Sequence, residues 1–422
     1  MLQAIKTSAL ARPLAHGRYR ALWLATLVSN MGGMMQTVAA AWLMATLTGS
    51  AHMVALVQSA STLPVMGLSL AAGAFADHFD RRHIMLVAQG LMFFASGLLA
   101  YLTWSGHIAP WSLLLLTLLV GMGIAIHAPA WQSSIRQHVP MEDLPEAISL
   151  NSIGYNVART MGPALGGALM LVAGPAANFS VNCITYVALI LVLLQWRAST
   201  APSPAPQKIS DQAMTVPSLL RAMRDGLVYV WQARTIRFAF LRNSIFAFAG
   251  AAIWALMPLI ARDVLAGSQL SYGGLLGAMG VGSIVGALLM TTARHRLNLQ
   301  QILAGSALAY GVASIGSISG VGLIWVMGLM LLAGIGWVLT LATVNVAIQI
   351  ESTQAFLARA IAINNMGVFG GLALGSYMWG MMADLIGLRA TILASGIAVI
   401  ATMALAAIMP LPQHAGRARP QA

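Results

Sequence analysis

Charge is scarce in this chain of 422 residues. Lys, Arg, Asp and Glu together make up 8% of the sequence, whereas about a quarter of a typical soluble domain is charged. Hydrophobic residues make up 59%, and the mean hydropathy is +0.81. Such a composition leaves too few charges to cover a water-facing surface, so it excludes a soluble globular protein and predicts an integral membrane protein.

Lysine and cysteine are nearly absent as well. The two lysines, Lys6 and Lys208, lie outside any glycine-rich phosphate-binding loop, which excludes a pump driven by ATP. Cys183 is the single cysteine. The chain can therefore form no internal disulfide, and its fold does not rely on an oxidising compartment.

Acidic residues number only ten. They form no cluster with histidine that would bind a metal, and no Ser/His/Asp set lies at one depth of the membrane, so we expect no enzyme activity, metal site or cofactor. A membrane sensor usually carries a soluble output domain, which the short tails at 1–20 and 411–422 do not supply.

Long apolar runs recur along the whole chain. A run of 18 or more apolar residues is long enough to cross a hydrocarbon core of about 30 Å as a helix. The runs predict an all-α membrane protein with twelve spans, near 21–47, 52–74, 83–104, 110–134, 148–172, 178–196, 236–261, 271–292, 300–318, 321–346, 360–383 and 388–409.

The basic residues are distributed unevenly between the two sides of the predicted membrane. With a cytoplasmic N-terminus, only Arg262 and Arg389 lie in outside loops, Arg159 and Arg242 lie within spans, and the remaining 22 − 4 = 18 lie inside. This bias follows the positive-inside rule and predicts that both termini are cytoplasmic. The net charge of +12 is thus explained by topology and the attraction of anionic lipid, and no nucleic-acid partner is expected.

An internal repeat divides the chain. The octapeptide AISLNSIG at 147–154 returns as AIAINNMG at 360–367, an offset of 367 − 154 = 213 residues. Small residues at every fourth position follow in both copies, where they share one helix face and let two backbones approach closely. The repeat predicts two related six-helix bundles, 21–197 and 235–410, which is typical of transporters.

The segment between the bundles, 198–234, begins with a stretch rich in Pro, Ser and Ala that predicts a flexible linker. Apolar residues at helical spacing follow from Leu219 to Trp231, with charges between them. This pattern predicts an amphipathic helix at the membrane surface, which we interpret as a strap between bundles.

Two motifs carry a resemblance to a known family. The loop after the second predicted span reads GAFADHFDRRHIML, and the fifth span reads GYNVARTMGPALGG. Both resemble signatures of the major facilitator superfamily. The matching residues are Gly73, Ala76, Asp77, Arg81 and Arg82 in the loop, and Gly154, Gly162, Pro163, Gly166 and Gly167 in the second motif, which resembles the antiporter motif.

Two segments, ADHFDRR and PAWQSSIRQHVP, indicate the group within that superfamily, because both resemble the corresponding segments of enterobactin exporters. The resemblance to that group covers nearly the whole chain. The resemblance implies the major facilitator fold and a monomeric secondary exporter of small amphipathic molecules, of siderophore or drug type. It also implies proton coupling and a place in the cell inner membrane. An importer or facilitator of an anionic metabolite is the alternative, and a non-transporting sensor is a third possibility.

A carboxylate at the membrane edge is the candidate gate. Asp77 lies beside Arg81 and Arg82 and within reach of Arg136 at the inner end of the fourth predicted span. Ion pairs there can lock the cytoplasmic side and release as the bundles rock. A solvated loop without a gating role is the simpler interpretation. For the glycines and Pro163 of the fifth span, the resemblance implies a seal against proton leak, and plain helix packing is the alternative.

Charged groups within spans are few, and an intramembrane charge is costly. Arg242 lies roughly 8 Å into its helix, so its side chain is expected to reach the cytoplasmic surface. Arg159 lies roughly 20 Å into the fifth span, near the midplane, where no acidic residue is predicted. An anionic substrate or permanent contacts with helix carbonyls and amides could satisfy it. His127, at about the level of Tyr155, is a possible proton carrier or a packing residue.

Residues that line the substrate path are expected from the superfamily pattern, in which the first, fourth, seventh and tenth spans face the centre. A few amides among aromatic and methionine walls would orient a ligand. Beside Arg159, His127 and Tyr155, the candidates are Asn30, Gln36, Trp131, Asn243, Trp254, Asn345 and, from the eleventh span, Asn364.

Overall fold

The computed structural model describes residues 9–78, 80–196, 216–353 and 356–411, and within these ranges its regular structure is entirely helical. The side chains at positions 9, 69–78, 216–223 and 358 lie outside that description. The predicted fold class, an all-α membrane protein, is confirmed by these helices and by their length and apolar character.

The first half of the molecule runs from residue 9 to residue 196. Its elements are η1 (Ala9–Ala15), α2 (Gly17–Leu47), α3 (Ala51–His78), α4 (Arg81–Trp104), α5 (Pro110–Ser134), η2 (Ile135–Gln137), η3 (Met141–Asp143) and α6 (Leu144–Gln195). Helix α6 has two arms that meet at Gly174, where φ is 76°, a conformation that favours glycine. Across this bend Asn178 donates a hydrogen bond to the carbonyl of Gly166 at 3.0 Å. The arms correspond to the predicted spans 148–172 and 178–196.

The second half follows α7 (Val216–Gln232). Its elements are α8 (Arg234–Leu259), a π-helical turn η4 (Ile260–Val264), α9 (Gln269–Arg296), α10 (Leu299–Gly316), α11 (Leu323–Glu351), α12 (Leu357–Ile386), α13 (Leu388–Ala401), the 3₁₀ turn η5 (Thr402–Ala404) and α14 (Leu405–Ile408). A helical segment thus occupies each of the twelve predicted ranges. Within the described residues, eight helical stretches are long and apolar enough to cross a membrane by length and composition, and twelve crossings remain a prediction.

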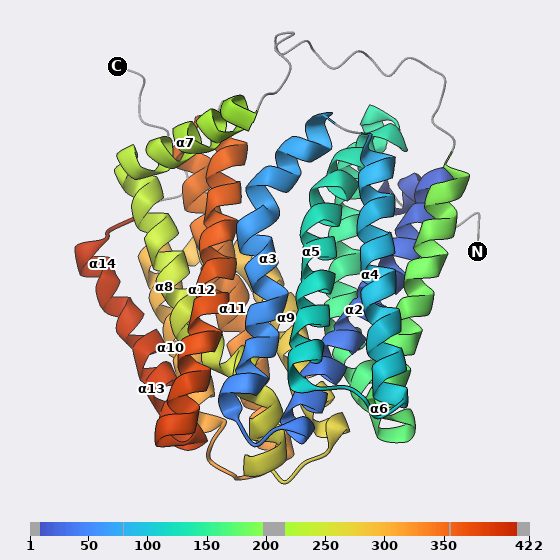
Figure 1. Cartoon of the computed structure of the whole chain (residues 1–422). Coiled ribbons are helices and arrows are strands. Elements are labelled where there is room, and N and C mark those ends of the chain that lie inside the picture. The colour runs from blue at the N-terminus through green and yellow to red at the C-terminus, as the bar shows by residue number, and fades with distance from the viewer. Residues whose placement is uncertain (1–8, 79, 197–215, 354–355, 412–422) are drawn as a thin grey trace.

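The two halves lie side by side, with α2–α6 in one and α8–α14 in the other (Figure 1). They meet where α3 packs on α12 and where α6 packs on α9. Helix α7 lies across the top of the second half in this view. We call the end at which α7 lies the linker end. We call the opposite end, which carries the turns α2–α3, α8–α9 and α12–α13, the closed end.

Helix α7 packs on the second half, where the sequence predicts a strap. Tyr229 stacks on Phe356 with ring centroids 4.4 Å apart, and Val230 is 1% exposed in a core with residues of α8 and α12. A Cβ at Gly226 would lie 3.4 Å from Arg359 of α12. The predicted amphipathic helix is therefore present and packs mainly on the second half, with a smaller contact to α3 of the first half.

The repeated small residues pack as the sequence predicts. Helices α6 and α12 begin at Leu144 and Leu357, an offset of 357 − 144 = 213 residues. A Cβ at Gly162 would lie 2.6 Å from Met34 of α2, and one at Gly371 would lie 2.5 Å from the carbonyl oxygen of Ser244 of α8. In each half the small-residue face of one helix therefore touches the first long helix of that half.

The linker end of the first half has its own core, built around Tyr19, Trp131 and Leu193. His138 closes it, stacked edge-on against Trp196 with centroids 4.4 Å apart. Burial, together with the positive charge of Arg18, lowers the pKa of His138 to about 4. The imidazole is therefore neutral at physiological pH and packs as an aromatic ring.

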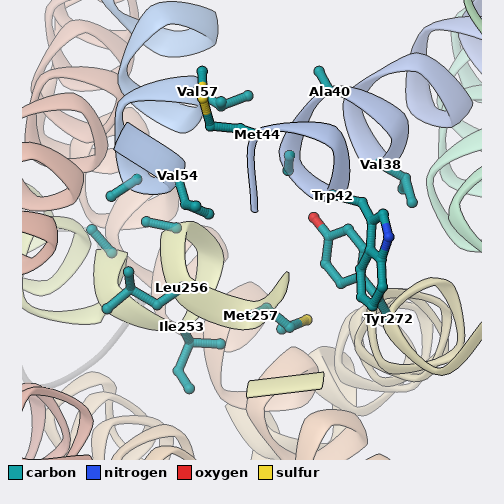
Figure 2. Close-up of a cluster of buried hydrophobic side chains, with 14 of the residues drawn as sticks. Val38, Ala40, Trp42, Met44, Val54, Val57, Ile253, Leu256, Met257 and Tyr272 are labelled. Atoms are coloured by element: carbon teal, nitrogen blue, oxygen red, sulfur yellow. The ribbon is translucent and has the colours of Figure 1, made fainter. Parts of the chain in front are cut away.

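A larger core joins the two halves at the closed end (Figure 2). Val38 and Trp42 of α2 and Val54 of α3 lie in one buried cluster with Leu256 of α8 and Tyr272 of α9. The rings of Trp42 and Tyr272 stack with centroids 6.1 Å apart. The halves are thus in apolar contact across this end.

Glycines allow α6 and α9 to touch near the same end. A Cβ at Gly167 would lie 2.6 Å from the carbonyl oxygen of Gln269, and one at Gly273 would lie 3.1 Å from the Cα of Gly167 and against the carbonyl of Pro163. Larger side chains would separate the backbones, so this contact depends on the absence of Cβ atoms.

We predict that Gly273→Val destabilises the protein by about 1–3 kcal/mol, because it overpacks the contact between α6 and α9. Gly274→Val is the matched control, since a Cβ there would meet only Met327 at 3.7 Å. Thermal unfolding in detergent should show a lower midpoint for Gly273→Val than for Gly274→Val. Equal midpoints would mean that the close approach of α6 and α9 is not required.

Candidate functional site

Arg159 joins the two halves near the middle of the molecule. It lies 15 residues after the start of α6, roughly 22 Å along the helix. Its guanidinium carbon is 5.4 Å from the ring centroid of Trp254 of α8, in a cation–π arrangement. The adjacent Thr160 lies against Gly280 of α9, whose Cβ would be 2.8 Å from the Cα of Thr160. Arg159 therefore contacts an aromatic ring of the other half.

Trp254 belongs to an aromatic cluster of the second half, formed by Phe246, Trp254, Tyr310 and Trp337. Its ring centroids are 5.6 Å apart for Trp254 and Trp337, 5.5 Å for Phe246 and Trp337, and 5.8 Å for Tyr310 and Trp337. The hydroxyl of Tyr310 donates to the carbonyl of Gly250 at 2.7 Å, which fixes its ring. The cluster forms a rigid apolar wall with Arg159 at its edge.

Several polar atoms on the helices of this region have no protein partner. They are Oγ1 of Thr160 and Nε1 of Trp254, each buried, and Nε2 of His127 on α5 of the first half is likewise buried without a partner. Most buried polar atoms in proteins are hydrogen-bonded, so such exceptions are informative. Among the described residues no carboxylate forms an ion pair with Arg159. The region therefore offers hydrogen-bond donors and one positive charge, which suit an anionic or acceptor-rich ligand.

Three predicted amides come together within the second half. Asn243 of α8 donates to Asn364 of α12 at 3.0 Å, and Asn364 donates to Asn345 of α11 at 3.0 Å. Asn243 and Asn364 are 0% and 1% exposed. These side chains connect three helices of one half, and Oδ1 of Asn243 is left without a partner.

Other predicted site residues lie apart from Arg159. Gln36 accepts hydrogen bonds from Ser96 and Asn182, both at 2.7 Å, inside the first half. The indole of Trp131 donates to Asn151 at 2.8 Å. Asn30 is half-buried and Tyr155 is exposed. Gln36 and Trp131 are thus engaged within their own half, whereas Arg159 and Trp254 link the halves.

The predicted gate is described in part. The side chain of Asp77 lies outside the described residues. Arg81 donates to the carbonyl of Ser133 at 2.9 Å, near the end of α5. Arg82 donates to the carbonyls of Leu193 and Leu194 at 2.8 and 3.0 Å, near the end of α6. Both arginines thus stabilise helix C-termini at the linker end, where a positive charge is favourable.

The remaining gate and motif residues have clear positions. Arg136 is exposed in η2 at the linker end. Gly154, Gly162 and Gly166 face α2, whereas Pro163 and Gly167 face α9 of the other half. The antiporter motif therefore packs within its half on one side and between halves on the other.

A clamp at the closed end escaped the sequence analysis. The carboxylate of Asp384, in the last turn of α12, accepts hydrogen bonds from the backbone N–H groups of Ala51 and His52 at 2.6 and 3.3 Å. It also accepts one from the hydroxyl of Ser50 at 2.6 Å. Asp384 thus caps the N-terminus of α3 from the other half, which suits a negative charge.

The second arm of the clamp is Arg262. It donates to the carbonyl of Ala45 in the last turn of α2 and is paired with Asp263. A positive charge therefore meets the C-terminus of α2, and a negative charge meets the N-terminus of α3. Among the described residues, the hydrogen bonds that join the halves all lie between this end and the middle of the molecule.

A protein-family model matches nearly the whole chain. The model of the family described as transmembrane secretion effector covers residues 7–421. The multidrug efflux pump Tap of Mycobacterium tuberculosis is 25% identical over 393 residues, which is 92% of each chain. The staphyloferrin A transporter of Staphylococcus aureus is 21% identical over 88% of this chain and 90% of its own length.

Solved structures share the fold. A bacterial homologue of the human lysosomal transporter Spinster, in an inward-facing and occupied conformation, matches with a TM-score of 0.73 and 16% identity over 94% of this chain and 97% of its own. The nucleoside transporter NupG matches with a TM-score of 0.67 and 12% identity over 94% and 100%.

We predict that Asp384→Ala opens the closed end more often, because it removes the cap that α12 provides for α3. Val54, which is 1% exposed, serves as the probe. In a Val54→Cys, Cys183→Ser background, maleimide labelling should accelerate at least about tenfold, because the change removes three hydrogen bonds to the carboxylate and the loss of one charge-assisted bond alone implies about that factor. Glu351→Ala, which removes an exposed carboxylate at the linker end, is the control. An unchanged labelling rate in Asp384→Ala would exclude the clamp.

Proposed function

Because the chain belongs to the transmembrane secretion effector family of the major facilitator superfamily, we propose that it is a secondary active exporter of small amphipathic anions. The contact that carries this proposal is Arg159 against Trp254, a charge of one half held on an aromatic wall of the other. The names of the similar Tap and staphyloferrin A proteins, an efflux pump and a transporter, support a substrate of drug or siderophore type.

The orientation in the membrane follows from the charges. Arg81, Arg82 and Arg136 lie at the linker end, and most other basic residues fall on the same side of the predicted spans. By the positive-inside rule, this end faces the cytoplasm and both termini are cytoplasmic. We place the protein in the cell inner membrane as a monomer, with domains 21–197 and 235–410 joined by the linker 198–234.

Alternating access between the halves is the proposed mechanism. The clamp and the apolar core hold the halves together at the closed end, which is then the outer end. In alternating access one end is open while the other is closed, so we infer that the substrate path opens to the cytoplasm at the linker end in this conformation. Transport would require the clamp to release while the linker end closes, as the two halves rock about the level of Arg159.

The charge of the substrate follows from the cost of Arg159. A guanidinium near the bilayer centre costs about 2.5–3.5 kcal/mol even on the lenient insertion scale. Contact with the Trp254 ring offsets part of this. A substrate carboxylate, catecholate or hydroxamate would offset more of this free-energy cost, in the orientation of the two halves that brings the substrate against Arg159. A ligand shifts the equilibrium between two conformations only through such a difference in affinity.

Proton coupling is part of the proposal, and His127 is its candidate carrier. The imidazole is the one side-chain type whose ordinary pKa lies near neutrality, and Nε2 of His127 is free of protein partners. The alternative function is a facilitator or importer of an anionic metabolite. The absence of a carboxylate paired with Arg159 among the described residues favours it, because proton-driven carriers commonly use such a group.

We predict that Arg159→Gln reduces transport of an anionic substrate at least tenfold, because it removes a charged hydrogen-bond donor. The assay is uptake into everted membrane vesicles of a fluorescent carboxylate and of its neutral methyl ester. Transport of the ester should change less than twofold. Arg159→Lys should retain part of the activity, and Arg389→Gln, an exposed arginine at the closed end, should behave like the parent.

The same vesicles test direction and coupling. Accumulation should require an imposed proton gradient and should stop when an uncoupler is added. Accumulation that survives the uncoupler would favour the facilitator. If Arg159→Gln transports the carboxylate as well as the parent does, the anionic substrate is excluded and Arg159 is structural.

We also predict that Asp77→Asn abolishes net transport while the protein stays folded, because the charge belongs to the proposed gate at the linker end. Transport is measured in the same vesicles, beside thermal unfolding of the purified variant. Asp80→Asn, three residues further on, is the control at the same edge. Near-normal flux in Asp77→Asn would remove the gating role.

A further inference from the structure

The second intramembrane arginine, Arg242, lies in surroundings that the sequence did not predict. It was expected to reach the membrane surface, but its side chain is 6% exposed inside the second half. Nη1 donates to the side-chain oxygen of Gln300 at 2.6 Å and to the carbonyl of Met409 at 3.3 Å. Gln300 in turn donates to the carbonyl of Leu411 at 3.3 Å. Packing between α8, α10 and the end of α14 therefore holds the guanidinium inside.

These contacts leave most of the guanidinium unused. Arginine has five N–H donors, and among the described residues only Nη1 of Arg242 takes part in a hydrogen bond. Both acceptors are neutral amide oxygens. No described carboxylate pairs with Arg242. A buried positive charge without a negative partner calls for one.

A recess lies beside Arg242. It is small and partly open to the surroundings. Arg242, Thr340 and Thr402 contribute polar atoms, and Phe246, Leu303 and Val344 contribute apolar walls. Thr340 is 4% exposed, and its hydroxyl has no partner. Two side chains that are more than nine-tenths buried and have unused hydrogen-bonding groups thus line one recess.

The wall of the recess is formed in part by a break in helical structure. The predicted span 388–409 changes from α-helix to the 3₁₀ turn η5 at Thr402–Ala404 before α14 begins. Short 3₁₀ stretches within helices often mark functional positions. Arg242 is eight residues into α8, roughly 12 Å along the helix from the linker end.

We propose that this recess is a binding site for a phosphate oxyanion, with Arg242 as the charge partner and Thr340 as a second donor. The guanidinium is well matched to phosphate because its planar N–H groups can form two parallel charge-assisted hydrogen bonds. An acidic phospholipid of the cytoplasmic leaflet and a soluble phosphate share this chemistry. Basic pockets between helices on that side of a membrane are suited to lipid headgroups. Phe246 belongs both to this recess and to the aromatic cluster beside Arg159, but the charged groups differ. Variants of Arg242 and of Arg159 therefore test the two proposals separately.

The test measures ligand-dependent thermal unfolding of the delipidated full chain in neutral detergent. Phosphatidylglycerol, phosphatidylcholine and inorganic phosphate are titrated separately at constant ionic strength. Phosphatidylglycerol should raise the midpoint of the parent more than phosphatidylcholine does. Arg242→Gln should weaken this binding at least tenfold, as the loss of a charged hydrogen bond implies.

Arg237→Gln is the matched control, because it removes one positive charge from the same helix near the same end. Arg237 is only half-buried and donates to the carbonyl of Trp231, so this variant should bind as the parent does. Thr340→Val changes no charge and should weaken binding severalfold. It carries the test if Arg242→Gln does not fold.

The outcomes distinguish a lipid ligand from a soluble phosphate, and both from the absence of a site. Stabilisation by phosphatidylglycerol that depends on Arg242 assigns the site to a lipid. Stabilisation by inorganic phosphate alone, with the same dependence, assigns it to a soluble anion. Equal losses in Arg242→Gln and Arg237→Gln, or no dependence on Arg242 and Thr340 with any ligand, would overturn the proposal.

Discussion

Close contact between α6 and α9 is the interaction on which the arrangement of the two halves depends. Lipid tails are as apolar as the side chains that face them, so helices in a membrane associate chiefly through tight packing. Gly167 and Gly273 provide it, because neither carries a Cβ where the two backbones meet. The same contact brings Thr160 against Gly280 and thereby sets Arg159 beside Trp254. The position of the candidate site follows from that packing.

Electrostatics complements this packing at the closed end. Asp384 and Arg262 bind the ends of α3 and α2, each at a helix terminus whose partial charge is opposite to its own. Hydrogen bonds of this kind can be broken and remade as rigid halves rotate, whereas an extensive apolar core alone would resist opening. The clamp and the glycine contact thus combine a firm closure with a means of release, which alternating access requires.

The two intramembrane arginines show how one residue type serves different purposes. Arg159 lies between the halves against an aromatic wall, so any partner it gains can depend on their orientation. Arg242 lies within one half, bound to Gln300 and to the C-terminal end of α14. Its surroundings would move as a unit during rocking. A ligand there would stabilise one half without selecting between conformations.

Periodicity and repetition predicted most of the fold. Helical segments occupy the predicted ranges because apolar length alone determines where a helix can cross lipid. The small residues around Gly162 and Gly371 pack as expected, because the repeated helix face contacts the equivalent helix in each half, α2 in the first and α8 in the second. The match to the transmembrane secretion effector family confirms the superfamily indicated by the two motifs.

Contacts between distant helices were not predictable in the same way. Asp384 and Ala51 are 333 residues apart, and no local pattern indicates that one caps the other. A signal was nevertheless present, because an acidic residue in the last turn of a helix is unfavourable unless it has another partner. Gln36, expected to face the substrate path, is held by Ser96 and Asn182 instead. Whether an amide faces a cavity or a neighbouring helix depends on rotations that the sequence does not encode locally.

The central claim is that the two halves separate at the closed end during transport. Trp111 and Val321 are both 71% exposed at that end, one in each half, and can be replaced by spin-labelled cysteines in a Cys183→Ser background. Pulsed electron resonance then reports the distance between the halves in vesicles. We predict one short distance at rest and a second, longer distance. The longer distance should become more populated when a proton gradient drives substrate export, and also in Asp384→Ala. A single distance that stays unchanged in every condition would contradict the account.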